Sequence, residues 1–187
     1  MGSQKRLEEK DQVEEKVEAV VSDAQRISQS LRSSLQLLAA AETGNVELVQ
    51  HLVQEIISRV DGNTSRFLVT ALFIAVAFGH ASIAEALVLG GVNINAKGLH
   101  GQTVLHVATR RNDVIMVKML LDRGADVRAK DDNGYTPWMA NVHTEKLETV
   151  SQLLLAAGTD VNDENNIGMS TLYTAAAGNH LSIVEFL

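Results

Sequence analysis

The sequence contains no cysteine, so neither disulfide bonds nor thiolate metal sites can form. It has no apolar run of the ~18 residues that a membrane-spanning helix needs, because its longest apolar stretch, Phe67 to Phe78, is short and is interrupted by Thr70. The first residues turn highly charged where a signal peptide would be apolar. These absences predict an intracellular protein, cytoplasmic or nuclear, that does not associate with a membrane.

Basic residues are in the minority, with 16 Lys and Arg against 23 Asp and Glu and a formal net charge of −7. Proteins that bind nucleic acids usually carry a clustered basic face, so we expect no nucleic-acid partner. Aromatic residues make up only 4% of the chain, whereas apolar residues make up 45%. Small aliphatic side chains therefore dominate, and they suit short helices that pack closely.

Three landmarks recur in the same order along the chain, with a period of 33 or 34 residues. The first opens at Gly101, Gly134 and Gly168, each followed two residues later by Thr or Ser. The second is a glycine at the end of an apolar run, as at Gly124 and Gly158. The third is Gly followed by Asn or His, at 44–45, 79–80 and 178–180. Recurrence of this kind predicts a repeat protein.

The sequence pattern of each unit predicts a helix, a turn, a second helix and a loop. Thr136 is suited to cap the first helix, and Pro137 is tolerated in its first turn because an N–H there would have no partner. The Gly-Asn and Gly-His landmarks should break the first helix, since glycine accepts positive φ. Gly124 and Gly158 should end the second helix in a left-handed conformation. One unit cannot bury its own apolar face, so the units must stack.

The units resemble ankyrin repeats, which have a Thr-Pro-Leu-His-x-Ala signature and a 33-residue period. The resemblance implies an all-α fold, a solenoid of stacked helix-turn-helix units with projecting β-hairpin loops, preceded by an N-terminal helix. The ankyrin-like units cover about 35–67, 68–100, 101–133, 134–167 and a truncated 168–187. Because the last unit stops within a helix, we expect the chain to be part of a longer protein.

Some units depart from the signature. The first, 35–67, lacks the Thr-Pro signature and the Gly-Ala-Asp hairpin, and its second helix is expected to run on to Val60. The fourth has Asn141 in place of an alanine and carries one extra residue, which we place in the turn at 144–146. Trp138 replaces the signature leucine, so we expect it in the core.

Residues 1–34 are predicted to form a charged amphipathic helix, since residues 4–33 contain no Gly or Pro and are rich in Glu, Lys, Gln and Arg. Apolar residues recur over less than three heptads, at Val13, Val17, Val20, Ala24, Ile27 and Leu31. Three interpretations stay open: a cap on the first repeat, a linker to an upstream domain, or a short coiled coil. Since a coiled coil needs heptads sustained over three or four repeats, we favour the cap, and a monomer over a homodimer.

No catalytic or metal-binding motif is present in the sequence. There is no His-Glu-x-x-His pair for zinc, no Gly-x-x-x-x-Gly-Lys-Ser/Thr phosphate loop and no Gly-x-Ser-x-Gly elbow. His80, His106 and His180 stand at repeat landmarks, where the resemblance implies structural hydrogen bonds to local backbone. We therefore expect a protein that is not an enzyme and that has no cofactor or metal.

The resemblance implies a binding surface on the concave face, where hairpin tips and the exposed side of each first helix meet. Leu99, Tyr135 and Met169 are apolar at tips that should face solvent, and successive units should present them at nearly equivalent sites. Arg110 and Arg111 lie beside this row, and interfaces favour aromatic, Met and Arg anchors. The predicted partner-binding residues are Leu99, His100, Gln102, Arg110, Arg111, Asp132, Asn133, Tyr135, His143, Ile167 and Met169.

The sequence therefore predicts a protein–protein interaction module, a scaffold that binds an unidentified partner protein on its concave face. The alternative is a regulatory or sensor segment of a larger multidomain protein, such as a fungal-type immune receptor or a channel.

Overall fold

The computed structural model describes residues 31–57, 64–140 and 148–178, together with positions 18, 20–22, 25, 28–29 and 184. Residues 31–43 are helical. The elements that follow are α2 (Val46–Ile57), α3 (Thr64–Phe78), α4 (Ala81–Leu89), the short 3-10 helix η1 (Leu99–Gly101), α5 (Val104–Arg110), α6 (Val114–Asp122), α7 (Pro137–Ala140), α8 (Glu148–Ala156) and α9 (Thr171–Ala177). Within these ranges the only β structure is an isolated bridge, so the predicted all-α class is confirmed.

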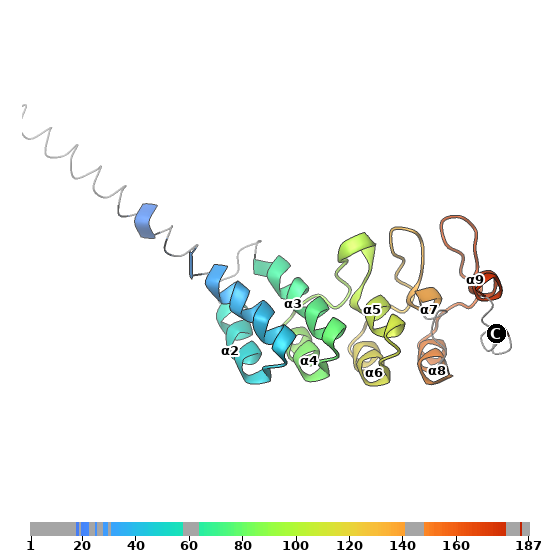
Figure 1. Cartoon of the computed structure of the whole chain (residues 1–187), viewed down its shortest axis with the longest axis horizontal. Helices are drawn as coiled ribbons and strands as arrows, with labels where there is room; N and C mark the ends of the chain where they lie inside the picture. Colours follow the sequence, from blue (N-terminus) through green and yellow to red (C-terminus); the bar gives the residue numbers. More distant parts are fainter. Residues whose placement is uncertain are drawn as a thin grey trace, which may run out of the picture.

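The helices form pairs that stack along one axis (Figure 1). α3, α5, α7 and α9 lie in one row, and α2, α4, α6 and α8 lie in a second row below it. The loops that join successive pairs project beyond the first row. Each helix contacts its counterpart one period away, α3 with α5, α5 with α7 and α4 with α6. The predicted solenoid of helix-turn-helix units is confirmed.

One continuous cluster of buried apolar side chains runs through the stack, from Leu37 to Leu154. Ala75 and Ala108 in this cluster are fully buried, and their small side chains let neighbouring helices approach closely. Trp138 is only 2% exposed, which confirms its predicted place in the core. Because the cluster draws on every α-helix from 31–43 to α8, each pair depends on its neighbours for burial.

The turn inside a pair uses a residue in the left-handed conformation. Gly44 and Gly79 have φ values of +79° and +78°, as predicted. In the third unit Asn112 takes this position with a φ of +52°, and asparagine is one of the few other residues that adopt it.

Gly178 was predicted to break the first helix of the last unit in the same way. α9 does end at Ala177, directly before it, but the left-handed conformation predicted for Gly178 is wrong. Its φ is −83°, and it is the C-cap of α9. Counted from the helix N-caps Ser170 and Thr103, Gly178 corresponds to Arg111, the C-cap of α5. A glycine fits both positions, so the sequence pattern did not separate them.

Glycines end the second helices as predicted. Gly124 has a φ of +87° and Gly158 a φ of +93°. At the end of α6 the Gly124 amide donates to the Leu121 carbonyl at 3.0 Å, and the Ala125 amide donates to the Leu120 carbonyl at 2.9 Å, which is the pattern of a Schellman motif. A β-carbon on Gly124 would meet no atom within 4 Å. Glycine is therefore required here for its backbone conformation alone.

Each projecting loop is closed by one backbone hydrogen bond. The amide donors and carbonyl acceptors are Gly98 and Gln102 at 2.8 Å, Asp131 and Tyr135 at 2.9 Å, and Asn165 and Met169 at 3.0 Å. The isolated bridge, between Glu164 and Ser170, extends the last of these. In the described part of the chain, the predicted hairpins are thus tight hairpin-shaped turns without a longer strand ladder.

Neighbouring loops pass so close that glycine is needed at one point in each. A β-carbon on Gly101 would lie 2.9 Å from the amide nitrogen of Asp132, and one on Gly134 would lie 2.6 Å from the amide nitrogen of Asn166. The Asp132 amide donates to the carbonyl of His100 at 3.0 Å. Any larger residue at these glycines would push the loops apart and break such bonds.

Lysine side chains also join successive loops. The ammonium group of Lys97 donates to the Lys130 carbonyl at 2.8 Å, and that of Lys130 donates to the Glu164 carbonyl at 2.9 Å. Equivalent side chains therefore make equivalent bonds, first 33 and then 34 residues along the chain.

The helix positions locate the extra residue of the fourth unit. α7 begins 33 residues after α5 (137 − 104), whereas the buried Val150 and Leu154 of α8 stand 34 residues after the buried Met116 and Leu120 of α6 (150 − 116 and 154 − 120). The extra residue thus lies between α7 and α8. The predicted turn at 144–146 and Asn141 fall in the segment 141–147, which is outside the described residues, as is Val60 beyond the end of α2.

The N-terminal segment differs in burial from the repeats. Glu18, Val20 and the other described positions up to 29 are exposed, whereas Leu37 and Ala40 are buried. Residues 31–43 pair with α2 through a turn in which the Asn45 amide donates to the Ala40 carbonyl at 3.0 Å, so this helix is the first helix of the first unit. The cap, linker and coiled-coil interpretations of 1–34 stay predictions.

One further prediction concerned membranes. Among the described helices, including α3 with the longest apolar stretch, none is long and apolar enough to cross a bilayer.

The left-handed Gly124 yields a stability prediction. Gly124→Val should lower the free energy of unfolding by about 1–2 kcal/mol or more, because a β-branched residue is strained at a φ of +87°. Gly124→Asn should lower the free energy of unfolding clearly less, since asparagine tolerates this conformation. Urea denaturation followed by circular dichroism measures both. If the valine variant unfolds at the same urea concentration as the parent, the end of α6 is misplaced.

Candidate protein-interaction surface

The residues predicted to bind a partner lie on the projecting loops and at the end of α5. We name the described residues of this predicted set the concave strip. They are Leu99, His100, Gln102, Arg110, Arg111, Asp132, Asn133, Tyr135, Ile167 and Met169. His143 falls outside the described residues. The three loops are neighbours, because the amide of Asp132 bonds to the carbonyl of His100 and that of Asn166 bonds to Asn133. The structure therefore brings the loop residues of the strip onto adjacent tips.

The apolar residues of the concave strip are exposed to different degrees. Leu99 is 85% exposed and Ile167 is 77% exposed, while Tyr135 and Met169 are half-buried. Burying a fully exposed leucine or isoleucine against a partner is favourable by about 1.5–3 kcal/mol. Leu99 and Ile167 are thus the strip residues with the most apolar surface to gain from contact.

The register of the loops separates Leu99 from the other apolar residues. Gln102, Tyr135 and Met169 are equivalent, since each accepts the backbone bond that closes its loop. Leu99 stands three residues earlier in its loop, so the near-equivalence predicted for Leu99, Tyr135 and Met169 does not hold. It fails because the prediction compared residue types at the tips rather than distances from the loop glycines.

Two arginines lie at the C-terminal end of α5, whereas the Leu99 loop joins α5 at its N-terminal end. Arg110 is the last residue of α5, and Arg111 is its C-cap. The guanidinium group of Arg111 lies near the turn between α3 and α4, since its Nη2 is 3.6 Å from the position of a β-carbon on Gly79. The predicted place of the two arginines directly beside the row of tips is therefore not what the structure has. Both are exposed, and neither forms an ion pair with another described residue. A guanidinium group of this kind has its donors available for a carboxylate, which it binds with two parallel hydrogen bonds.

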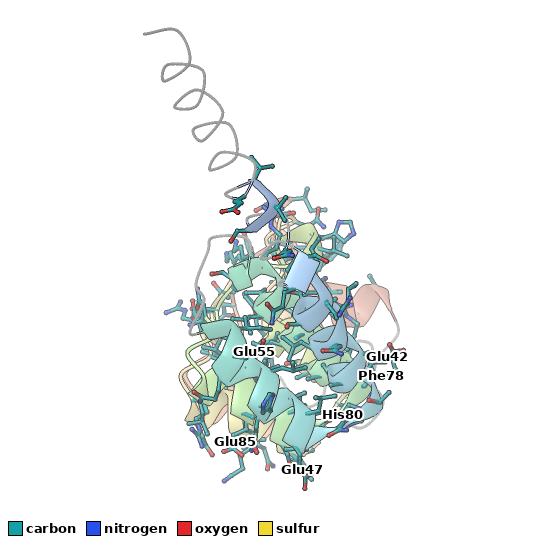
Figure 2. All side chains as sticks on the ribbon, turned by 90° about the vertical axis from the view of Figure 1, so that its left-hand side faces the viewer. Glu42, Glu47, Glu55, Phe78, His80 and Glu85 are labelled. Carbon is teal, nitrogen blue, oxygen red and sulfur yellow. The ribbon has the colours of Figure 1, made fainter. Side chains whose placement is uncertain are left out.

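The buried His106 connects the base of the strip to the next loop. Its Nδ1 lies 3.1 Å from the Thr103 amide nitrogen and accepts its hydrogen bond, and its Nε2 lies 2.9 Å from the Tyr135 carbonyl oxygen, to which it donates. His80 has a similar role, with Nε2 3.0 Å from the Glu42 carbonyl oxygen and its ring stacked on Phe78 (Figure 2).

The predicted structural role of these histidines is confirmed for His80 and His106, with one difference. Both reach the backbone of a neighbouring unit, 38 and 29 residues away, rather than local backbone alone. His180 lies outside the described residues. Burial lowers the pKa of His106 below its ordinary value of 6.5, and its hydrogen bond to the Tyr135 carbonyl only partly opposes this effect.

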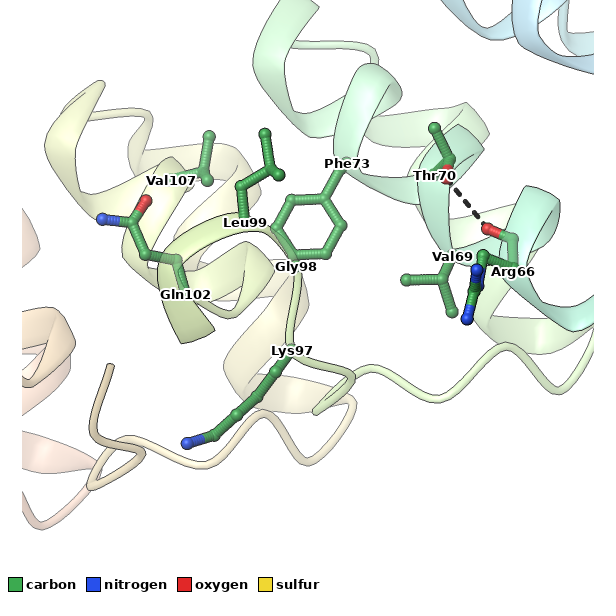
Figure 3. Close-up of a pocket in the computed structure, with 9 residues that line it drawn as sticks. All are labelled: Arg66, Val69, Thr70, Phe73, Lys97, Gly98, Leu99, Gln102 and Val107. Carbon is green, nitrogen blue, oxygen red and sulfur yellow. Dashed lines mark hydrogen bonds between the residues drawn. The ribbon is translucent and has the colours of Figure 1, made fainter. Parts of the chain in front are cut away.

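A pocket beside the strip was not found from the sequence. It has a volume of about 640 Å³ and lies between α3 and the loop that carries Leu99 (Figure 3). Its lining residues are Arg66, Val69, Thr70, Phe73, Lys97, Gly98, Leu99, Gln102 and Val107. Four of these nine residues belong to α3, whose apolar run indicated a buried helix and gave no sign that part of it lines a cavity.

The described residues offer little for catalysis or metal binding. They contain no group of three or more His, Asp or Glu side chains placed to hold a metal ion. What the surface does present is exposed apolar side chains, free guanidinium groups and an open pocket. This chemistry suits recognition of another molecule.

Stacked pairs of short helices with a 33- to 34-residue period and projecting loops define a helical-repeat solenoid of the protein-binding kind. A family model described as ankyrin repeats, three copies, matches residues 37–131 and 116–187. The chain belongs to the ankyrin-repeat family. Ankyrin repeats are a non-catalytic protein–protein interaction module.

Several known proteins are similar to the chain. The putative ankyrin repeat protein FPV031 of Fowlpox virus (strain NVSL) is 30% identical over 161 residues, which is 83% of this chain and 47% of that protein. The B-cell lymphoma 3 protein homolog of Mus musculus is 34% identical over 123 residues, 63% of this chain and 27% of that protein. The RelA-associated inhibitor of Mus musculus is 34% identical over 93 residues, which is 50% of this chain and 11% of that protein. The chain spans less than half the length of each of these relatives.

The environment of His106 gives a pH-dependent prediction. Its pKa is lowered in the folded protein, so the unfolded chain takes up a proton first as the pH falls below about 6.5, and stability is lost there. In His106→Gln the side chain stays neutral and can still accept from the Thr103 amide, as in a capping box. The stability advantage of the parent over this variant should therefore shrink from pH 7.5 to pH 5.5.

Urea denaturation of both proteins at pH 7.5, 6.5 and 5.5 measures this difference. The other histidines are common to both proteins and cancel in the comparison. A difference that stays constant over this range contradicts the assignment of a lowered pKa to His106.

Proposed function

We propose that the chain binds a partner protein through the concave strip, with Leu99, Arg111, Tyr135 and Ile167 among the contacts. The observation that carries this proposal is the high exposure of apolar side chains on neighbouring tips, at 85% for Leu99 and 77% for Ile167. Burial of such apolar surface favours association. Interfaces are also enriched in Tyr and Arg, which Tyr135 and the unpaired Arg111 supply among the described residues.

The framework under the strip supports the same proposal. Successive loops are fixed to one another by the Lys97 and Lys130 side chains and by backbone bonds such as that from Asp132 to His100. A surface that is ordered before binding loses less conformational entropy when a partner docks. The loops therefore offer a pre-organised surface, as a binding module requires.

The proposal includes the kind of protein this is. The chain acts as an intracellular monomer that recognises another protein and has no catalytic activity of its own. Membership of a family of interaction modules supports this, and so does the name of one relative, the RelA-associated inhibitor, which states association with another protein. Neither nucleic acid nor a membrane is the partner that we propose.

A second candidate places the same module inside a larger regulatory or sensor protein. Relatives in which the matched region is a minor part, 27% and 11% of their length, favour this. The two candidates share the concave strip as the recognition surface.

The concave strip can be tested against the opposite side of the stack. Tyr135→Ala combined with Arg111→Ala should weaken partner binding at least ~30-fold, because buried anchors cost ~2 kcal/mol when truncated and such effects roughly add at separate sites. A partner is first captured with the parent from cell extract, and its affinity for each variant is then measured by calorimetry. The melting temperature of the variant should stay near that of the parent.

The matched control is Lys118→Ala combined with Gln152→Ala, on the exposed side of α6 and α8. This pair should bind as tightly as the parent. If the control loses binding while the Tyr135 and Arg111 variant binds normally, the partner docks on the second-helix side and the concave strip is the wrong surface.

A further inference from the structure

We propose that the pocket between α3 and the Leu99 loop is a docking site for a partner segment in which one large apolar side chain is flanked by acidic residues. This deepens the proposed function and rests on it, because it assigns a chemical class of partner to one part of the surface. Four features carry the proposal: the volume of the pocket, its apolar walls, the glycine that shapes it and the sign of the charges at its rim.

The pocket has the size and lining of an anchor site. Its volume of about 640 Å³ is bounded by Val69, Phe73, Leu99 and Val107, and Figure 3 shows the Phe73 ring and Leu99 close to one another, with Val107 beyond them. Ligand pockets typically measure about 300–1,000 Å³ and are mainly apolar. One large apolar side chain of a partner and part of its backbone fit in such a space.

The position of Phe73 depends on Gly98. A β-carbon on Gly98 would lie 2.7 Å from Cζ of Phe73, which is too close for any neighbouring atom. The aromatic ring therefore rests directly on the loop backbone, where no side chain fills the space. Phe73 itself is partly buried and packs on the core, so this wall of the pocket is fixed before a partner arrives.

The charges at the rim select an acidic partner. Arg66 and Lys97 line the pocket, and its lining among the described residues includes no Asp or Glu, although the whole chain has a net charge of −7. The Lys97 ammonium is held by its bond to the Lys130 carbonyl and keeps two further N–H donors. The Arg66 side chain is exposed and forms no ion pair with a described residue. Carboxylates beside the anchor would meet both cations, whereas a basic segment would be repelled.

A peptide selection tests this chemistry directly. Random 12-residue peptides displayed on phage are selected against the full chain, and enriched peptides are then synthesised with a fluorescein label. We expect them to share one Phe, Leu or Trp with at least two Asp or Glu residues within three positions of it. Fluorescence anisotropy then gives the Kd of each peptide.

Paired charge reversals place the binding site. Arg66→Glu with Lys97→Glu should raise the Kd at least tenfold, while Lys118→Glu with Arg128→Glu, an equal change of charge at exposed sites outside the pocket, should change it less than threefold. Leu99→Ser should also raise the Kd, and it should leave the fold intact because Leu99 is 85% exposed. Gly98→Ala, which pushes the Phe73 ring from its place, should also raise the Kd, by a smaller factor.

Three results overturn the pocket proposal: no enriched peptide, enriched peptides without acidic residues, or acidic peptides that bind the two charge-reversed proteins equally well. Failure of the pocket proposal can be told apart from failure of the proposed function. If the captured partner protein still binds the Arg66 and Lys97 variant but loses the Tyr135 and Arg111 variant, the concave strip stands and the pocket does not.

Discussion

The architecture depends on the inability of one repeat to satisfy its own loop. The loop carbonyl of Lys130 is bonded by Lys97 from the preceding unit, and that of Glu164 is bonded by Lys130 in turn. His106 reaches the Tyr135 carbonyl in the same direction. Backbone groups need such partners, and in these three bonds the partner lies in the neighbouring unit, 29 to 34 residues away. The bonds between neighbouring units therefore require the sequence to repeat with the same period with which the units stack.

This coupling explains what the sequence could predict. The glycines at 101, 134 and 168 recur at 33 or 34 residues because each stands at the same point of a loop, so their spacing was enough to predict stacked units. Gly124 and Gly158 followed from helix chemistry alone, since an apolar helix that ends in glycine has few other conformations. The burial of Trp138 followed from its place in the signature.

Other features depend on residues distant in sequence and could not be read from a pattern. The pocket exists because Gly98 faces Phe73, which lies on a different helix 25 residues earlier (98 − 73), and no local rule relates the two. The turn at Gly178 was misassigned because its exact register depends on the cap at Ser170. The unequal loop positions of Leu99 and Tyr135 became clear only from the bonds that close each loop.

The surface and the framework use different parts of each loop. Leu99 and Ile167 are highly exposed, whereas the loop backbones are held by other side chains, such as those of Asp131 and Asn165. Substitution of Leu99 or Ile167 can therefore alter binding with little effect on folding.

The glycines at 101 and 134 have one more consequence. Since a β-carbon at either would collide with the next loop, each loop sits as near its neighbour as two backbones allow, and the interval between tips is fixed. The row of tips therefore presents its side chains at a constant spacing. Under the proposed function, a partner would be selected for the spacing of its contacts as well as for their chemistry, because only anchors set at that interval can engage two tips at once.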